Sequence, residues 1–172
     1  MVPNSQAFSQ ELVDQNVSAG DYVLDLTPKS GRNSRLLAAR VGDEGKVLSF
    51  HADADIANEI AASLLLSGLN DRVEIFGKQI DQNFALELGH HQLALAMIDY
   101  SRDGGFNDDA TSPLLQDCQI VMNHLKKQGL LIMKSNQAEP ELNQFFDTLF
   151  EEDYQHAYYL SNGIHTYLLG RC

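Results

Sequence analysis

Positive charge is scarce in this chain of 172 residues. Lys and Arg together number 12 against 24 Asp and Glu, which gives a formal net charge of −12. Proteins that hold nucleic acid through its phosphates usually present a basic face, because neutralising phosphates supplies most of the non-specific affinity. The one adjacent basic pair is Lys126-Lys127. The charge therefore disfavours tight, autonomous binding of RNA or DNA, and it says nothing about the fold.

Cysteine and long apolar stretches are also scarce. The two cysteines do not make a disulfide framework, and we expect a buried thiol at Cys118 and a bystander at Cys172. The histidines show no metal-ligand spacing, so no metal site is predicted. No stretch approaches the ~20 apolar residues that span a bilayer, which predicts no membrane association. Residues 1–6 lack the basic region and apolar core of a signal peptide, and a cytoplasmic location is the default expectation.

What the chain does have is a regular series of seven short apolar runs. Their cores are near-continuous rather than alternating, which is typical of strands buried on both faces of a parallel sheet. Helical segments alternate with them, as in a doubly wound α/β domain. No repeat or linker interrupts the series, so we expect a single domain over residues 1–172. The predicted strands are 22–26, 46–50, 72–76, 93–98, 129–134, 156–160 and 164–169.

The predicted helices carry recognisable start and stop signals. Gly42 ends the second helix, Asp53 can cap the third, and Ser112-Pro113 is a cap followed by proline at the first helical position. The last helix opens at Glu139-Pro140, with Leu142, Phe145, Phe146, Leu149 and Phe150 as its buried face. The other predicted spans are 5–15, 30–41, 53–66, 81–88 and 112–127.

The last two predicted strands differ from the others. Only Ser161-Asn162-Gly163 separates them, which is too short for a crossover helix, and an Asn-Gly turn between two β-rich runs indicates a hairpin. The predicted fold is therefore a mostly parallel seven-stranded sheet with a C-terminal antiparallel hairpin. Among doubly wound folds this specification fits the Rossmann-like class I methyltransferase architecture better than the all-parallel NAD-binding one.

The segment 25–33, Asp-Leu-Thr-Pro-Lys-Ser-Gly-Arg-Asn, follows the first predicted strand and opens a helix. A nucleotide-type ligand is held at this place in a doubly wound domain. The loop retains one glycine, Gly31, where such loops usually carry two or three, and it is not a phosphate-binding Gly-x-x-x-x-Gly-Lys-Ser/Thr motif. The position of the segment thus indicates a cofactor site, whereas its residues differ from those of the usual glycine-rich loop.

Four segments carry a resemblance that runs from about Phe8 to Leu169. The chain resembles S-adenosylmethionine-dependent methyltransferases, and among them the YtqB-type family of rRNA and tRNA methylases, whose members look like wobble-uridine methyltransferases. The segments are Val-Ser-Ala-Gly-Asp-Tyr-Val-Leu-Asp-Leu-Thr at 17–27, Ala-Ala-Arg-Val-Gly-Asp-Glu-Gly-Lys-Val at 38–47, Asn-Asp-Arg-Val at 70–73, and Gly-Gly at 104–105 followed by Thr111 and a helix.

The chain also departs from that family's motifs. Lys29 stands where the Asp-x-Thr-x-Gly-x-Gly loop has a glycine, and His51 stands where an aspartate follows the second strand, with Asp53 two residues later. After the third strand, the stretch 78–83 keeps only the tail of an Asp-Gly-His-Gln-Asn-like motif. The motif after the fourth strand, normally Asn-Leu-Gly-Tyr-Leu-Pro, is reduced to Asp-Tyr-Ser-Arg-Asp at 99–103.

The resemblance implies S-adenosylmethionine as cofactor and assigns candidate residues to it. Asp25 would orient the loop or the cofactor's amino group, or else only cap the turn. Gly31 would give backbone N–H groups room near the carboxylate at a helix N-terminus. Lys29 would either pair with that carboxylate or block the site. The full candidate set for the cofactor is Asp25, Thr27, Lys29, Gly31, His51, Asp53 and Asp81.

Each of the later candidates has a second interpretation. A neutral His51 accepts one hydrogen bond where a carboxylate would accept both ribose hydroxyls. Asp53 is explained equally well as a helix cap. Asp81 could reach the adenine with its neighbours or begin a helix. Asp99 and Tyr100 would face the substrate, where a carboxylate can orient an amine or accept its proton.

We therefore carry several functional hypotheses. The first is a methyltransferase acting on an amine or base of tRNA or rRNA, where in-line transfer needs mostly positioning. The second is a degenerate, non-catalytic binding module, and the third is methylation of a small molecule or protein, which the acidity tolerates better. The apolar face around Tyr158, Tyr159 and Tyr167 is either core or the surface of a homodimer. The sequence does not define the methylated atom.

Overall fold

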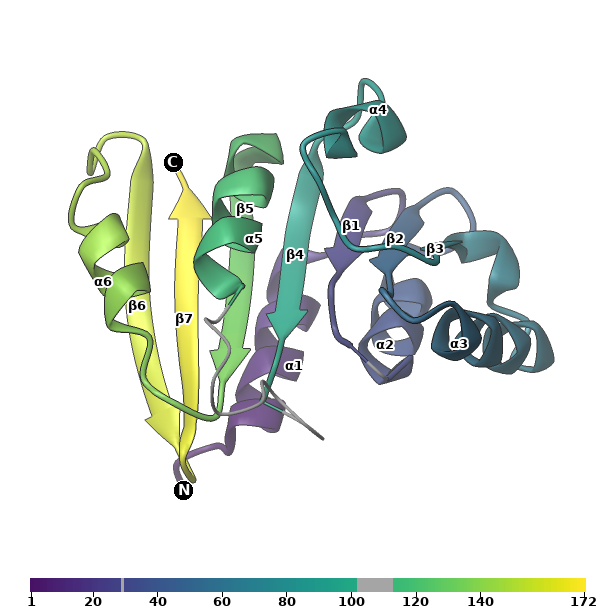
Figure 1. The fold of residues 1–172 in the computed structure, drawn as a ribbon, viewed down its shortest axis with the longest axis horizontal. Coiled ribbons are helices and arrows are strands. Elements are labelled where there is room, and N and C mark those ends of the chain that lie inside the picture. The colour runs from purple at the N-terminus through teal and green to yellow at the C-terminus, as the bar shows by residue number, and fades with distance from the viewer. Residues whose placement is uncertain (29, 102–112) are drawn as a thin grey trace.

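The computed structural model describes residues 1–28, 30–101 and 113–172, and it contains a seven-stranded sheet of order β3-β2-β1-β4-β5-β7-β6. Figure 1 shows the strands running from β6 at one edge to β3 at the other. The strands are β1 (Tyr22–Asp25), β2 (Lys46–Phe50), β3 (Val73–Phe76), β4 (Leu93–Asp99), β5 (Leu125–Ser135), β6 (Tyr154–Ser161) and β7 (Ile164–Arg171). The first five pair in parallel, and β7 pairs antiparallel with both β5 and β6.

This arrangement confirms the predicted mostly parallel sheet with an antiparallel C-terminal hairpin. The hairpin turns where Asn162 and Gly163 take φ values of 52° and 76°, a region that asparagine and glycine enter most readily. Because β7 enters between β5 and β6, the hairpin extends the sheet beyond β5 and closes one side of it.

Helices cover both faces of the sheet, as the continuous apolar runs predicted. One face packs on α1 (Ser5–Asn16), α2 (Arg32–Val41) and α3 (Ala54–Leu66), and the other packs on α4 (Phe84–Leu88), α5 (Leu114–Val121) and α6 (Pro140–Phe146). Neighbouring residues of β1 divide between the two cores: Val23 packs with α1–α3 and Leu24 with α4–α6. Cys118, from α5, lies fully buried in the second core, as expected, while Cys172 is exposed.

Two local predictions are wrong. The helix predicted over 112–127 ends at Val121, a short 3-10 turn follows (η2, Met122–His124), and Leu125 already begins β5, where it pairs opposite Leu93 of β4. The spacing of Leu125 fits a helix, but its side chain reaches the same core from the strand β5. In the last helix, α6 stops at Phe146, so that Phe150 lies beyond it and is 77% exposed rather than buried.

The tyrosines near the hairpin separate into core and surface. Tyr167 is buried in the core, where its hydroxyl oxygen accepts a hydrogen bond from the backbone N–H of Glu139. Tyr158 is 49% exposed and contacts His165 on the neighbouring strand. The described helices include none long and apolar enough to cross a membrane.

The strand order fixes where a ligand can bind. The chain runs from β1 to β2 on one side and returns to β4 on the other side of β1, so the connections leave the carboxyl ends of β1 and β4 in opposite directions. Ligands of open α/β sheets bind in the crevice at such a switch point. A ligand is therefore expected at the carboxyl ends of β1, β2 and β4.

Candidate functional site

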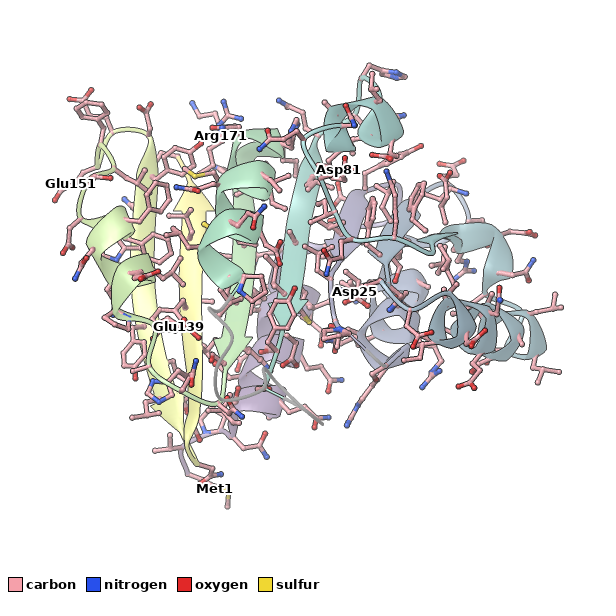
Figure 2. All side chains as sticks on the ribbon, in the orientation of Figure 1. Met1, Asp25, Asp81, Glu139, Glu151 and Arg171 are labelled. Atoms are coloured by element: carbon pink, nitrogen blue, oxygen red, sulfur yellow. The ribbon has the colours of Figure 1, made fainter. Side chains whose placement is uncertain are left out.

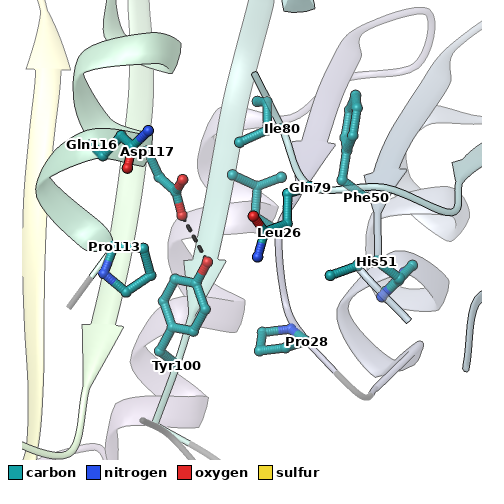
Figure 3. A pocket seen from close by; sticks show the side chains of 11 residues that line it. Leu26, Pro28, Phe50, His51, Gln79, Ile80, Tyr100, Pro113, Gln116 and Asp117 are labelled. Carbon is teal, nitrogen blue, oxygen red and sulfur yellow. Dashed lines mark hydrogen bonds between the residues drawn. The ribbon is translucent and has the colours of Figure 1, made fainter. Parts of the chain in front are cut away.

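A cavity of about 220 Å³ opens at the switch point. Residues that follow β1, β2, β3 and β4 line it, and the start of α5 closes its far side (Figure 3). Its volume is below the ~300–1,000 Å³ of pockets that enclose a whole drug-sized ligand, so the described residues could enclose only part of such a ligand. The lining residues are Leu26, Pro28, Phe50, His51, Ala52, Gln79, Ile80, Tyr100, Pro113, Gln116 and Asp117.

One wall of the cavity is apolar. The ring of Phe50, at the end of β2, stacks on Phe76 of β3 with centroids 4.5 Å apart and meets Phe84 of α4 edge to face at 5.9 Å. Ile80 and Leu26 add aliphatic surface to the same cavity, and both are buried in the core. A flat aromatic heterocycle packs well against a wall of this kind.

The opposite wall holds a partly buried hydrogen bond. The Tyr100 hydroxyl, at the end of β4, donates to the Asp117 Oδ2 atom on α5 at 2.7 Å (Figure 3). Burial raises the pKa of the Asp117 carboxyl to about 6, and the bond from Tyr100 acts in the opposite direction. Burial and the neighbouring carboxyl together raise the pKa of the Tyr100 phenol. Two exposed amide side chains, Gln79 and Gln116, supply further donors and acceptors.

A line of four buried polar groups connects the loop after β1 to the cavity. The Ser34 hydroxyl of α2 donates to Asp25 Oδ2 at 2.6 Å, and the oxygens of Ser34 and Ser49 lie 2.9 Å apart. The Ser49 oxygen, on β2, lies 2.7 Å from His51 Nε2. All four residues are at most 2% exposed.

His51, the last residue of this line, has one ring nitrogen without a hydrogen-bond partner among the described residues. This nitrogen, Nδ1, is buried. Burial lowers the pKa of the His51 ring, which favours the neutral form. A buried polar atom without a partner costs about 1–3 kcal/mol, so a ligand group or a water molecule that pairs with Nδ1 would be stabilised there.

Asp25 is fully buried and does not line the cavity. Its Oδ1 atom accepts the backbone N–H of Thr27 at 2.9 Å, and the hydroxyl of Thr27 in turn accepts from the Asn33 amide at 2.8 Å. Burial raises the pKa of the Asp25 carboxyl to about 6 against the hydrogen bonds from Ser34 and Thr27. Asp25 and Thr27 thus hold the shape of the loop from beneath it.

The single loop glycine has a packing role in addition to its place in the loop. Gly31 caps α2 with φ −91°, a conformation open to any residue. A Cβ atom there would lie 2.8 Å from Cγ2 of Ile60 on α3 and 3.4 Å from the Arg35 guanidinium. A side chain at position 31 would therefore push α2 and α3 apart. Lys29 lies outside the described residues.

Two of the sequence-predicted acidic residues are exposed and engaged by neighbouring groups. Asp53 caps α3, where its Oδ1 accepts the N–H groups of Asp55 and Ile56. Asp81 accepts the backbone N–H of Asn83 and lies 3.6 Å from the Lys78 ammonium; it stands away from Asp25 in the molecule (Figure 2). The cavity is lined instead by Gln79 and Ile80, the residues directly before Asp81.

The two candidate substrate residues differ in their relation to the cavities: Tyr100 lines the first, and Asp99 reaches the second through its neighbour Ser101. Asp99 is 4% exposed and its Oδ1 accepts both the N–H and the hydroxyl of Ser101, at 3.0 and 2.5 Å. Ser101 lines a second cavity, of about 260 Å³, together with Lys134, the start of α1 and the β6–β7 turn. Tyr100 lines the first cavity. The segment after β4 therefore lies between the two cavities.

Of the residues that line the cavity, the sequence predicted His51 and Tyr100 as site residues and did not predict most of the others. Asp117 left a signal, since it is a charged residue on the apolar face of a helix between Leu114 and Val121. Ser34 and Ser49 left a weaker one, as small polar residues at buried positions of a helix and a strand. Over residues 1–28, 30–101 and 113–172, no group of three or more His, Cys, Asp or Glu side chains could hold a metal ion.

The strand order, the hairpin and the place of the cavity define the class I methyltransferase fold, and solved structures of that class match the whole chain. A candidate rRNA methylase from Clostridium thermocellum matches with TM-score 0.83 at 18% identity, covering 100% of both chains. An rRNA methylase from Streptococcus thermophilus matches with TM-score 0.78 at 13% identity, over 99% of this chain and 98% of the other.

A third structure of the same fold was solved with a ligand. It is a candidate methyltransferase from Streptococcus mutans in complex with S-adenosylhomocysteine, with TM-score 0.81, 12% identity and 100% of both chains covered. No protein-family model matches the chain, and no curated protein matches it in sequence. At these identities the similarity establishes the fold.

Proposed function

We propose that this chain is an S-adenosylmethionine-dependent methyltransferase whose cofactor lies in the switch-point cavity. The observation that carries the proposal is the cavity itself. It lies where the strand order reverses, between the carboxyl ends of β1 and β4, and its walls come from every strand end on the β1–β3 side. The structural neighbour with bound S-adenosylhomocysteine supports the same ligand class.

The residues present fit the adenosine portion of such a cofactor. Phe50 and Ile80 offer apolar surface for the adenine ring. The amides of Gln79 and Gln116 can pair with its polar edge, because each offers both a donor and an acceptor. The unpartnered His51 Nδ1 atom can accept a ribose hydroxyl.

The loop residues would act mainly by holding that cavity in shape. Asp25 and Thr27 fix the turn after β1, and Gly31 lets α2 pack on α3. Asp53 and Asp81 are engaged in capping their own segments, so we propose a supporting role for them as well.

When bound, S-adenosylmethionine supplies an electrophilic methyl group, and the chain's own residues must position the acceptor. The second cavity is the candidate acceptor site, because Ser101 lines it and Tyr100, the preceding residue, lines the first. Its Lys134 side chain is buried and donates to the carbonyl of Ser5, which places a positive charge beside the cavity. Asp99 precedes Tyr100 and accepts from Ser101, so we propose that its carboxylate orients an amine there.

For the acceptor we propose an amine or base of tRNA or rRNA, in keeping with the rRNA methylases among the structural neighbours. Membership of the YtqB-type family stays a prediction from the sequence. The net charge of −12 favours a second candidate, a small-molecule acceptor, because the chain lacks the cationic surface that RNA usually requires. Transfer of a labelled methyl group to total tRNA, rRNA or a metabolite extract separates the two.

Cofactor binding itself is tested by calorimetric titration with S-adenosylhomocysteine. Gln79→Ala removes an amide that lines the cavity and should weaken binding about five- to tenfold, the effect of one hydrogen bond. Gln82→Ala is the matched control, since Gln82 is an exposed glutamine three residues later that does not line the cavity. Heat and affinity that are the same for both variants would place the cofactor elsewhere, and no heat at millimolar ligand would support a non-catalytic module.

A further inference from the structure

The buried line from Asp25 to His51 has a direction. An ionised carboxylate only accepts hydrogen bonds, so the Ser34 hydroxyl must donate to Asp25, and it does so at 2.6 Å. A hydroxyl has one proton to give. The Ser34 oxygen is therefore the acceptor in its 2.9 Å contact with Ser49, and the Ser49 hydroxyl is the donor. The Ser49 oxygen must then accept from His51 Nε2, 2.7 Å away.

This ordering selects one form of the His51 ring. A neutral imidazole carries a proton on one nitrogen and a lone pair on the other. If the Nε2 atom donates to Ser49, the Nδ1 atom holds the lone pair, and Nδ1 is the buried atom that has no partner among the described residues. His51 lines the cavity, and the group that pairs with its Nδ1 lone pair must be a donor.

We propose that Asp25, acting through Ser34 and Ser49, holds His51 in the Nε2–H form so that Nδ1 is the acceptor for a single ribose hydroxyl of the bound nucleoside. The ligand half of this inference rests on the proposed function; the half that concerns the ring does not. Asp25 is a positioning residue here, because it acts on the ligand only through the two serines. A carboxylate at position 51 would accept two hydroxyls, whereas this ring accepts one.

The substitution Asp25→Asn reverses the line without changing its size. The new side chain has one acceptor oxygen, and the Thr27 backbone N–H, 2.9 Å from Oδ1, claims it. The amide NH₂ group must then face Ser34 and donate. Each hydroxyl along the line turns around, the Ser49 hydroxyl donates to Nε2, and the proton of His51 moves to Nδ1. The charged group that acts on Asp25 from a neighbouring element is Asp99 on β4, and it is the same in this variant.

The first test reads the ring directly in the ligand-free protein. Long-range ¹H–¹⁵N correlation spectra at about pH 8 distinguish the two neutral forms of a histidine, and His51→Phe assigns the signal. We expect the Nε2–H form in the wild type and in Ser9→Ala, whose buried serine lies on α1 and bonds to Ser5. We expect the Nδ1–H form in Asp25→Asn. An Nδ1–H wild type, or an Asp25→Asn spectrum that matches it, overturns the proposal.

The second test reads the hydroxyl. Affinities of S-adenosylhomocysteine and its 2′-deoxy and 3′-deoxy forms are measured on the wild type and on His51→Phe, which keeps a ring and loses the acceptor. One deoxy form should bind about tenfold more weakly than the parent to the wild type, and that difference should vanish in His51→Phe. Deoxy penalties that are the same in both proteins overturn the assignment of Nδ1. Failure of the parent ligand to bind the wild type would overturn the proposed function and leave the ring measurement intact.

Discussion

The buried carboxyl of Asp25 should give the fold a stability that falls as pH rises. Its pKa is raised from 3.8 to about 6 in the folded protein, chiefly because burial removes water from the charged form. Between those two values the folded state therefore binds more protons than the unfolded state. Stability is greatest below the unfolded pKa and declines as pH rises through the folded one. A shift of about 2 pKa units corresponds to about 3 kcal/mol.

The variant Asp25→Asn removes this titration and isolates it from the rest of the molecule. Asp117, whose pKa is also raised to about 6, and the net charge of −12 contribute their own pH dependence to both proteins. The quantity to follow is the free energy of unfolding of the variant minus that of the wild type, measured by urea denaturation between about pH 4 and pH 8.

We expect that difference to rise by about 3 kcal/mol over the range, with the increase between about pH 4 and pH 7. Glu59→Gln, which neutralises an exposed carboxyl on α3, is the control and should give a difference that changes little with pH. A difference for Asp25→Asn that is equally independent of pH would refute the reasoning, because it would mean that the buried carboxyl titrates as it does in the unfolded chain.

Three further predictions concern packing and the cavity. Gly31→Ala should lower the free energy of unfolding by about 1–3 kcal/mol, because its Cβ meets Ile60 at 2.8 Å, and the loss should shrink in an Ile60→Ala background; equal losses in both backgrounds would exclude that contact as the cause. Tyr100→Phe should cost about 1–3 kcal/mol at pH 8 and less at pH 4, where its carboxylate partner is protonated; urea denaturation at the two pH values checks this. Gln116→Ala should weaken S-adenosylhomocysteine about five- to tenfold in calorimetry, and Gln119→Ala, an exposed neighbour on α5 that does not line the cavity, should not.

The fold could be predicted because its signals are local and repeated. Continuous apolar runs such as the one that became β4 occur where a strand is buried on both faces, and every residue of β4 is buried. The Asn162-Gly163 pair predicted the antiparallel hairpin because asparagine and glycine readily adopt the positive φ values that a tight turn requires. The predicted helix over 112–127 failed because Leu125 has the right spacing for a helix and the right character for a strand. Its pairing opposite Leu93, a contact distant in sequence, decided between them.

The site could be predicted only where the fold dictates a position. His51 follows β2 and Tyr100 follows β4, and the strand order alone brings both to the cavity. Which neighbour of each faces inward depends on side-chain partners. Asp53 caps α3, and Asp117 lines the cavity through its hydrogen bond with Tyr100, 17 residues away in the sequence, a pairing that no local pattern predicts. The partnership of Asp25 with Ser34 is nine residues apart and depends on how α2 packs over β1.

Calorimetric titration of the intact chain with S-adenosylhomocysteine tests the central claim most directly, when it is done in parallel on His51→Phe. We predict saturable binding to one site on the wild type and weaker binding to the variant, because His51 lines the cavity and its Nδ1 atom has no partner among the described residues. Absence of binding to the wild type at millimolar ligand, or equal affinity for the two proteins, would contradict it.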